Sequence, residues 1–433
     1  MRSIKETMTS CLYPGGEDFL GEEIRCSHFS EKKLSYSVYS GAYVLPFKHL
    51  ENGKTGGGVE THEGEYLLSS GVHYGFCCSY CFDRSNVKHK NEDVIYLGMF
   101  NGAWGHCLTD NIRRIWFLKS DEYRNSYPDC KIVYTALDSF SFSDSFIKLL
   151  SIFGLEAEKL EKIDEIREYR NIIIPDESFY SDGSGFRFFT NEYLENIGQI
   201  RNYALTVKPP IDLPTDIGKI YLSYSQYSIG KTSGEEMLAE FFSQNGFTII
   251  APENFSFDSQ LYLYSHCDIM ASTVGSCSHN SIFLKDGADL ILIPRAYYLT
   301  GYQAALNEVN SINITLVDSS LSDRVNSEYP WGGPFCFFVS HELERLFDED
   351  SCTKRLYAKN MARRTLKNYF HIALQCERMF TSEEINPPEY YQIAVQGYIA
   401  EMFSTLGISQ RCSNFVKKTL RFLNNIYVRI KKC

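Results

Sequence analysis

The chain has 433 residues with 43 basic and 54 acidic side chains, which gives a formal net charge of −11. This length predicts about two domains, and the acidic balance argues against a general nucleic-acid-binding protein. No apolar run approaches the roughly 18 residues that a membrane-spanning helix requires. The opening MRSIKETMTSCLYPGG lacks the apolar core of a secretory signal, so we expect the 14 scattered cysteines to be free thiols in a reducing cytosol.

Aromatic residues are abundant, at 15% of the chain, with 30 Tyr and 30 Phe. Aromatic rings stack on the apolar faces of sugars while a tyrosine hydroxyl forms hydrogen bonds, so this composition suits a carbohydrate-binding surface. It equally suits an aromatic-rich hydrophobic core, and the sequence leaves both interpretations open.

The first half of the chain predicts an α/β domain. Residues 1–90 show only strand-like pieces, such as 34–45, and a glycine-rich loop. From residue 93 onward, apolar runs alternate with segments of helical periodicity, which is typical of α/β folds. The predicted elements are a strand at 94–100, a turn at 102–105, a helix at 106–119, a strand at 131–135, a helix at 143–153 closed by Gly154, and a strand at 170–175.

A linker and a second alternating series follow. Residues 206–218 contain three prolines and few apolar positions, so they are predicted to be a linker. The two series together predict two doubly wound α/β domains, at 1–205 and 206–345, with C-terminal helices at 346–405. The predicted elements of the second series are a strand at 219–223, a helix at 234–245, a strand at 247–251 and a helix at 257–266.

Residues 268–294, DIMASTVGSCSHNSIFLKDGADLILIP, predict a strand, a small-residue turn, a short helix and a second strand. Gly275, Ser276 and Ser278 lie where the first strand leads into the helix. Small residues let a ligand approach the backbone, and a helix N-terminus offers unpaired N–H groups to an anion. The segment therefore predicts a nucleotide-phosphate site, although any strand-turn-helix unit needs a small-residue turn of this kind.

Residues 406–433 predict a basic amphipathic helix. No acidic residue follows Glu401, and basic residues are interleaved with apolar residues at spacings of three or four. Such helices lie in the interface of anionic membranes, so we expect peripheral attachment to the inner face of the cell membrane. The alternative is a helix docked on the acidic body of the protein.

Three stretches share a recognisable order: GAWGHCLTDNIRRIWFL at 102–118, GFTIIAPENFSFDSQLYLYSH at 246–266 and VGSCSHNSIF at 274–283. Together they resemble glycosyltransferase family 61 in its bacterial capsular-polysaccharide form, over roughly residues 93–295. The resemblance implies a GT-B fold, in which two Rossmann-type domains face a cleft. It also implies transfer of a sugar from a nucleotide donor, with inversion and without a catalytic metal.

The chain departs from the family's pattern at two positions. Val274 stands where many members have a histidine, and Tyr224 stands where an arginine is expected after the strand. That arginine would bind donor phosphate, and Lys231 in the following loop is the expected substitute for its charge. The loop is not a Walker A loop, because Ser225 occupies the position of the first glycine.

His106 and Asp110 lie four residues apart on the first predicted helix, so their side chains share a face. Glycosyl transfer needs a base for the proton of the acceptor hydroxyl, and a carboxylate or an imidazole can serve. We predict Asp110 as the base with His106 orienting it. The alternatives are the reverse assignment and a purely structural role. One of Arg113 and Arg114 is expected to face the cleft and bind an anion, and the other to be solvated.

The donor diphosphate is expected at the turn, where the backbone and the side chains of Gly275, Ser276, Ser278 and Asn280 supply hydrogen-bond donors. Glu253 follows a predicted strand, at a position where ribose-binding carboxylates occur in such folds. Gln260, on the next helix, is a further candidate. An asparagine in a first helical turn and an acidic loop residue are also common without any ligand.

We predict no metal site and no cofactor besides the nucleotide-sugar substrate. Cys77, Cys78 and Cys81, with His73 and His89 nearby, lack the two well-spaced ligand pairs of a structural zinc site. The stretch WGGPF at 331–335 either lines the cleft or turns the chain toward its C-terminal helices.

The sequence thus predicts a cytoplasmic, membrane-associated glycosyltransferase that builds a surface polysaccharide. Its partners would be a nucleotide-sugar and a saccharide or lipid-linked acceptor, and not a nucleic acid. One alternative is a polysaccharide-modifying transferase, such as a pyruvyltransferase that uses phosphoenolpyruvate. Another is a non-catalytic assembly protein with a decayed donor site, which the departures at Val274 and Tyr224 keep open.

Overall fold

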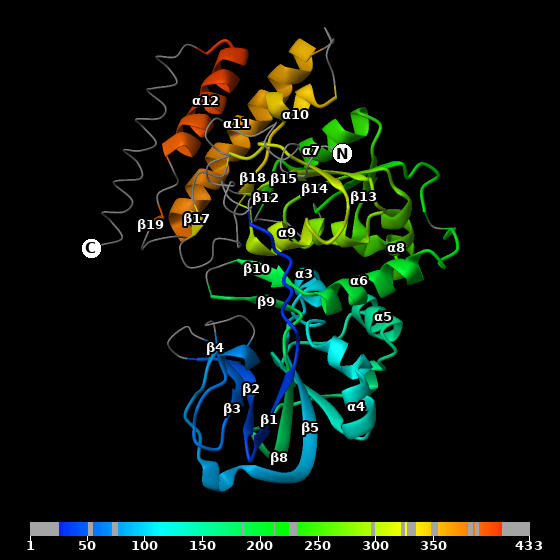
Figure 1. Cartoon of the computed structure of the whole chain (residues 1–433). Helices are drawn as coiled ribbons and strands as arrows, with labels where there is room; N and C mark the ends of the chain where they lie inside the picture. Colours follow the sequence, from blue (N-terminus) through cyan, green and yellow to red (C-terminus); the bar gives the residue numbers. More distant parts are fainter. Residues whose placement is uncertain are drawn as a thin grey trace, which may run out of the picture.

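A computed structural model of the whole chain shows two lobes, each built on its own sheet (Figure 1). The first lobe holds strands β1 to β8, and the second holds β11 to β16 with two long C-terminal helices beside it (Figure 1). The structure describes residues 26–50, 55–71, 77–183, 186–211, 213–224, 232–295, 299–321, 325–326, 335–347, 354–379, 384–385 and 389–408.

The sheet of the first lobe is mixed. Its strand order is β4-β3-β2-β8-β5-β6-β7, with β1 also paired to β8. Strands β5 to β8 form parallel pairs, whereas β1 and β2 run antiparallel to β8. The strands are β1 (Tyr36–Ser40), β2 (Tyr43–His49), β3 (Thr55–Glu60), β4 (Cys77–Cys78), β5 (Lys88–Phe100), β6 (Lys131–Ala136), β7 (Leu160–Lys162) and β8 (Arg167–Pro175).

The prediction of a doubly wound first domain is therefore wrong for the N-terminal part of this sheet. Strands β2 and β3 are separated only by residues 50–54. That connection is too short for the crossover that a parallel pair requires, so the two strands pair antiparallel. The β8-β5-β6-β7 part has the parallel arrangement expected from the sequence.

The predicted helix at 106–119 is also wrong in its extent. It consists of α3 (Trp104–Leu108), a series of turns, and a 3-10 helix at Ile115–Lys119. The side chain of Asn111 accepts from the backbone N–H of Asn101 and donates to its carbonyl oxygen. These side-chain contacts with backbone compete with helical hydrogen bonds and favour turns at this point. Helix α5 (Asp144–Ile152) is confirmed, with Ser143 as its N-cap and Gly154 beyond its end at a φ of 78°.

The sheet of the second lobe is fully parallel, with the order β13-β11-β14-β15-β16. This is the doubly wound arrangement, and its order reverses between β11 and β14, where such sheets bind ligands at their carboxyl ends. The predicted helices and strands of this lobe are confirmed, with small shifts at their ends. They are β11 (Lys219–Leu222), α7 (Glu235–Gln244), β13 (Thr248–Ile250), α8 (Phe257–His266), β14 (Ile269–Thr273) and β15 (Asp289–Ile293). The lobe also contains α9 (Gly301–Leu306) and β16 (Asn313–Leu316), for which the sequence made no prediction.

The two lobes share a core. One cluster of buried apolar side chains contains Ile95 and Leu97 of β5 together with Ile220 and Leu222 of β11. Helix α6 (Asn191–Ala204) lies between the lobes and packs against α8 (Figure 1). Ion pairs add to this contact, because Arg201 lies 2.8 Å from Asp286 and Lys148 lies 3.3 Å from Asp258.

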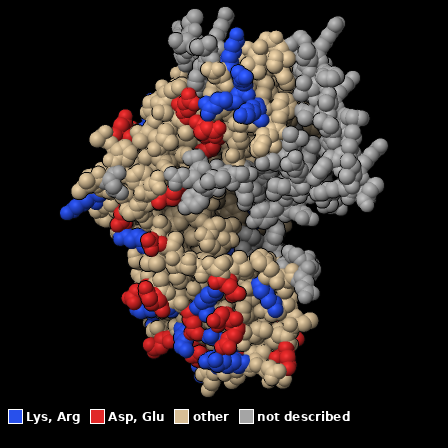
Figure 2. Space-filling view, turned by 180° about the vertical axis from the view of Figure 1, so that it is seen from behind, with Lys and Arg blue, Asp and Glu red and all other residues tan. Residues whose placement is uncertain are grey.

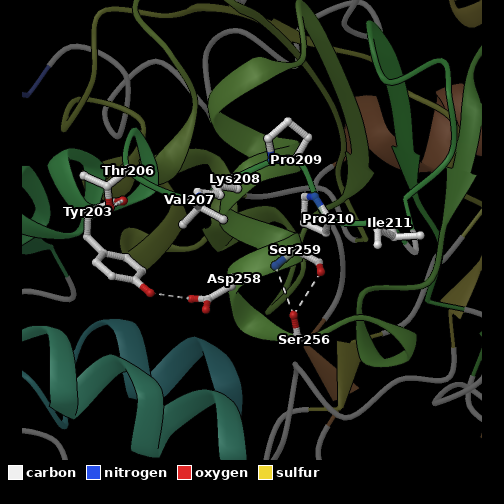
Figure 3. Close-up of a pocket in the computed structure, with 10 residues that line it drawn as sticks. All are labelled: Tyr203, Thr206, Val207, Lys208, Pro209, Pro210, Ile211, Ser256, Asp258 and Ser259. Atoms are coloured by element: carbon white, nitrogen blue, oxygen red, sulfur yellow. Dashed lines mark hydrogen bonds between the residues drawn. The ribbon is translucent and has the colours of Figure 1, made fainter.

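The predicted linker contains no helix or strand at residues 206–211 and 213–218. With the end of α6 and the start of α8 it encloses a pocket of about 520 Å³ (Figure 3). In this pocket the hydroxyl of Tyr203 donates to Asp258, and Ser256 caps α8 (Figure 3). None of the predicted site residues lines this pocket.

Helices α11 (Lys354–Met379) and α12 (Glu389–Thr405) pack against each other beside the second lobe. Among the helices that the structure describes, none is both long and apolar enough to cross a bilayer. The predicted tail helix lies outside the described residues from residue 409 onward, as do residues 331–334 of the WGGPF stretch.

Candidate active site

The start of α3 in the first lobe lies directly against the turn that follows β14 in the second. A methyl group at Gly105 would lie 2.7 Å from Nδ1 of His279 and 3.2 Å from Oγ of Ser276, so only glycine fits there. Beside it, the indole nitrogen of Trp104 donates to Oδ1 of Asn280 over 2.8 Å. The fold thus brings together the two motifs that the sequence assigned to catalysis and to donor binding.

His106 and Asp110 are in contact, as their spacing predicts. Nδ1 of His106 lies 2.5 Å from Oδ2 of Asp110. The side chain of His106 is 29% exposed, whereas that of Asp110 is only 4% exposed. The imidazole is therefore the member of the pair that reaches the surface.

The carboxylate of Asp110 is enclosed by hydrogen-bond donors. Tyr302 donates to Oδ1 over 3.0 Å, Thr109 donates to Oδ2 over 3.1 Å, and Nη1 of Arg113 lies 3.5 Å from Oδ1. Together with His106, these groups form polar contacts with both carboxylate oxygens of Asp110. Such contacts hold a negative charge in place and fix the ring that is bonded to it.

Tyr302 was not identified from the sequence. It lies on α9 of the second lobe, and its ring packs edge-to-face on His106 with 5.8 Å between centroids. Burial, and then the charge of Asp110, raise the pKa of Tyr302 well above its usual value, so the phenol remains a hydrogen-bond donor. Because it belongs to the other lobe and carries no local motif, only the tertiary contact reveals it.

The prediction for Arg113 and Arg114 is wrong, because both side chains are buried. Arg113 donates to the carbonyl oxygen of Gly71, and Arg114 donates to that of Pro175. Both guanidinium groups also pair with Glu177, at 3.2 Å and 2.9 Å. They hold the turns after α3 against the first sheet, and Arg114 is not solvated.

His279 lies next to the pair at the contact between the lobes, where the residue is half-buried and its Nδ1 atom is fully covered. Burial, followed by the positive charge of nearby His106, lowers its pKa to about 4. Its ring stacks on Tyr302 with 6.4 Å between centroids. At neutral pH the imidazole of His279 is therefore uncharged and lines one side of the site.

The turn after β14 is closed by the side chain of Ser278. Its Oγ accepts from the N–H of Gly275 over 2.9 Å and donates to Oε1 of Gln303 over 2.5 Å. Asn280 is occupied as well, by Trp104 and by the carbonyl oxygen of Cys277. The side chains of Ser278 and Asn280 thus form hydrogen bonds within the protein that shape the turn.

The helix after this turn differs from the prediction. It is a short 3-10 helix at Ser278–Phe283, so it lacks the aligned backbone groups of a longer α-helix. The hydroxyl of Ser276 has no hydrogen-bond partner among the described residues. Of the predicted donor-turn side chains, Ser276 is the one that remains available to a ligand.

Glu253 lies in the 3-10 turn Pro252–Asn254 that follows β13. Its Oε1 is buried without a hydrogen-bond partner in the part of the chain that the structure describes. Gln260 supports this turn, because Nε2 donates to the carbonyl oxygens of Pro252 and Phe255. Glu253 therefore has an oxygen to offer a ligand, whereas the amide of Gln260 is used in positioning the turn.

Lys231 and Tyr224 both concern the charge that the family's pattern places after β11. Lys231 lies outside the described residues. The ring of Tyr224 lies 4.6 Å from Cζ of Arg295, which follows β15. Arg295 was not identified from the sequence. Its place directly after the apolar run LILIP is a signal, since ligands bind at the carboxyl edges of such sheets.

The cysteine cluster does not form a metal site among the described residues, where no group of three metal-ligating side chains converges. Sγ of Cys77 instead lies 3.3 Å from Oγ1 of Thr55. His73 is outside the described residues.

A match to a known protein family covers the part of the chain that holds this site. Residues 104–291 match the family model described as Glycosyltransferase 61. A comparison with curated proteins found no match. The matched stretch begins at α3 and ends in β15, so it includes the His106–Asp110 pair and the turn at Gly275. The site-bearing part of the chain is therefore similar to glycosyltransferase family 61, and this match supports glycosyltransferase activity.

Proposed function

We propose that the protein transfers a sugar from a nucleotide-sugar to a hydroxyl group of a saccharide or lipid-linked acceptor, in the assembly of a capsule-like surface polysaccharide. The observation that carries this proposal is the contact of α3 with the turn after β14. It places the His106–Asp110 pair next to Ser276 and His279. A base and a donor-phosphate turn must lie this close to act on one substrate.

His106 is the base in this proposal, and Asp110 orients it. The buried carboxylate accepts a hydrogen bond from Nδ1 of the imidazole, which fixes the tautomer and leaves Nε2 able to accept a proton. Nε2 then takes the proton of the acceptor hydroxyl as its oxygen attacks the anomeric carbon. The bond from that carbon to the donor phosphate breaks, and the nucleoside diphosphate leaves with the electron pair. These roles reverse those that the sequence favoured, because burial withdraws Asp110 from the surface.

The two lobes serve as the two domains of a GT-B enzyme, 1–205 and 206–345. The parallel sheet of the second lobe, with its order reversal beside β11 and β14, supports donor binding there. Ser276 and Glu253 are the predicted side-chain contacts of the donor. Inversion at the anomeric carbon and independence from a catalytic metal follow from the family resemblance and belong to the same proposal.

A thermal-shift screen tests the donor assignment. Saturating ligand stabilises the folded state by about 2.7 kcal/mol at a hundredfold excess over the dissociation constant. We expect UDP-, GDP-, CDP- or dTDP-linked sugars to raise the melting temperature, and mass spectrometry of acceptor mixtures to detect the added sugar. Stabilisation by phosphoenolpyruvate alone would indicate a pyruvyltransferase. No stabilisation by any of these compounds would contradict the proposal.

We also propose a cytoplasmic enzyme held at the inner face of the membrane by its basic tail. Side chains of both signs are interspersed over the first lobe on the face seen in Figure 2, so the first lobe supplies no single-sign surface on that face. The full chain is expected to sediment with anionic vesicles at low salt and to be released at high salt. A chain cut after Ile408, which keeps the buried Phe403 of α12, should stay in solution and still bind nucleotide. Equal sedimentation of both chains would contradict attachment by the tail.

A further inference from the structure

Three positions meet at the carboxyl edge of the second sheet. Tyr224 follows β11, Gly275 follows β14 and Arg295 follows β15, each two residues beyond the end of its strand. Strands β11, β14 and β15 are neighbours in the sheet, and its order reverses between the first two. Open α/β sheets bind ligands at this place.

The guanidinium group of Arg295 is charged but incompletely paired. Its Nε and Nη2 atoms are buried and have no hydrogen-bond partner among the described residues. No ion pair to the nearby carboxylate of Glu235 forms among the described residues: its Oε1 accepts from the hydroxyl of Tyr221 and from the N–H of Tyr224, and its Oε2 is buried without a hydrogen-bond partner. A buried cation without partners destabilises a protein, so these donors point to an anionic ligand.

The surroundings hold this group in place without satisfying its hydrogen bonds. Cζ of Arg295 lies 4.6 Å from the ring centroid of Tyr224 and 5.2 Å from that of Phe335, which are cation–π distances. On another side, a methyl group at Gly275 would lie 2.7 Å from Cζ, so glycine alone leaves room for the guanidinium group. Aromatic rings and a glycine thus position the cation and leave its N–H groups for a ligand.

We infer that Arg295 binds the diphosphate of the nucleotide donor and stabilises its charge as it leaves; this inference rests on the proposed function. Arg295 supplies the charge missing at Tyr224, and Tyr224 supports it through its ring. A guanidinium group can donate two parallel hydrogen bonds to phosphate oxygens, which a lysine cannot reproduce. Its contact with Gly275 places it beside the turn that contacts α3.

The test compares a nucleoside diphosphate with its nucleoside. Whichever of UDP, GDP, CDP and dTDP stabilises the wild type most is titrated by calorimetry against wild type and Arg295→Met, alongside the matching nucleoside. We expect the variant to lose about 10- to 100-fold in affinity for the diphosphate, as for charge-assisted hydrogen bonds. Its affinity for the nucleoside should stay within about twofold of wild type, because the base and ribose do not depend on the lost charge.

A second measurement separates ligand binding from a structural role. Without nucleotide, Arg295→Met should melt at or above the wild-type temperature, since an incompletely paired buried cation is removed. With nucleoside diphosphate the order should reverse, because only the wild type gains the ligand's stabilisation. The control is Arg201→Met, which removes the same charge from the Asp286 ion pair away from the turn. Arg295→Lys should give an intermediate affinity, and it replaces the methionine variant if that one does not fold.

Two outcomes overturn the inference. Diphosphate affinity within about twofold of wild type in a folded Arg295 variant would mean that the side chain only packs on its aromatic neighbours. A lower melting temperature without nucleotide, together with equal losses for diphosphate and nucleoside, would mean the same. If the wild type binds none of the four diphosphates, the proposed function fails as well, which distinguishes that failure from the failure of Arg295 alone.

Discussion

The hydroxyl of Tyr302 lies 3.0 Å from Oδ1 of Asp110, and this hydrogen bond joins the second lobe to the first. It links helix α9 to the pair that we propose for proton transfer. The position of the base therefore depends on how the two lobes are packed.

Replacing Tyr302 with Phe keeps the ring and removes the donor to Asp110. We expect kcat to fall about tenfold and the free energy of unfolding to fall by about 1–2 kcal/mol, as for a hydrogen bond to a charged group. The affinity for donor should remain, because Tyr302 does not lie on the turn that binds it. Steady-state kinetics and urea unfolding measure both effects. Tyr262→Phe, on the partly exposed side of α8, is the control, and equal behaviour of the two variants would refute the role of Tyr302.

The roles of His106 and Asp110 can be separated by chemical rescue. His106→Ala should lose about 10²–10⁴-fold in kcat and keep donor affinity, since acid–base catalysis contributes this much. Added imidazole should restore part of the rate, because the side chain of His106 is 29% exposed and its removal opens the site to solvent. Asp110→Asn should not be rescued by formate, because that carboxylate is buried. Rescue of Asp110→Asn by formate with a near-normal His106→Ala would make Asp110 the base.

Gly275 should not tolerate a side chain, because its φ of 151° favours glycine and a methyl group would press on Arg295. We expect Gly275→Ala to lose at least about tenfold in nucleotide affinity and about 1–3 kcal/mol of stability. A larger side chain, as in Gly275→Leu, should abolish nucleotide binding. The matched control is Gly246→Ala, since Gly246 has a φ of 79° and nothing within 4 Å of an added methyl group. If both alanine variants bind nucleotide equally well, the contact with Arg295 has no bearing on the site.

Stability should depend on pH through His279. Its pKa falls from an ordinary value of 6.5 to about 4 on folding, so the unfolded chain binds the proton more tightly. The stabilising effect is present above pH 6.5 and is lost as pH falls toward 4, by about 3 kcal/mol at 1.4 kcal/mol for each pKa unit. Urea unfolding of wild type and His279→Gln from pH 4 to 7.5 should show a difference that varies over this range.

The difference in unfolding free energy between wild type and His279→Gln removes the effect of Asp318, which is present in both proteins. Burial raises the pKa of that carboxyl group to about 7, so it destabilises the protein as pH rises, in the opposite sense to His279. His266→Gln, at an exposed position, is the control and should parallel the wild type. A constant difference between His279→Gln and wild type over the whole range would show that His279 is not buried as a neutral ring.

Much of the second lobe could be predicted from sequence because its signals are local. Helix α8 occupies the predicted residues 257–266, where Ser256 caps the first turn and apolar side chains recur at helical spacing. The contact of His106 with Asp110 likewise joins residues only four positions apart, although α3 ends at Leu108 and Asp110 lies in the turn that follows. Such features depend on a few neighbouring residues, so they can be predicted without knowing the contacts of the rest of the chain.

Other features depend on partners far along the chain. The antiparallel pairing of β1 and β2 with β8 joins segments more than 100 residues apart, and no local pattern encodes it. Burial of Asp110 beneath Tyr302, and of Arg113 and Arg114 against Glu177, arises only when the lobes and the first sheet assemble. Sequence alone therefore determined most elements of the second lobe and the two motifs of the site. Tertiary packing decided which side chains face solvent, which are held by protein contacts, and which, like Arg295, keep donors free for a ligand, because solvation and pairing depend on all the atoms around a group.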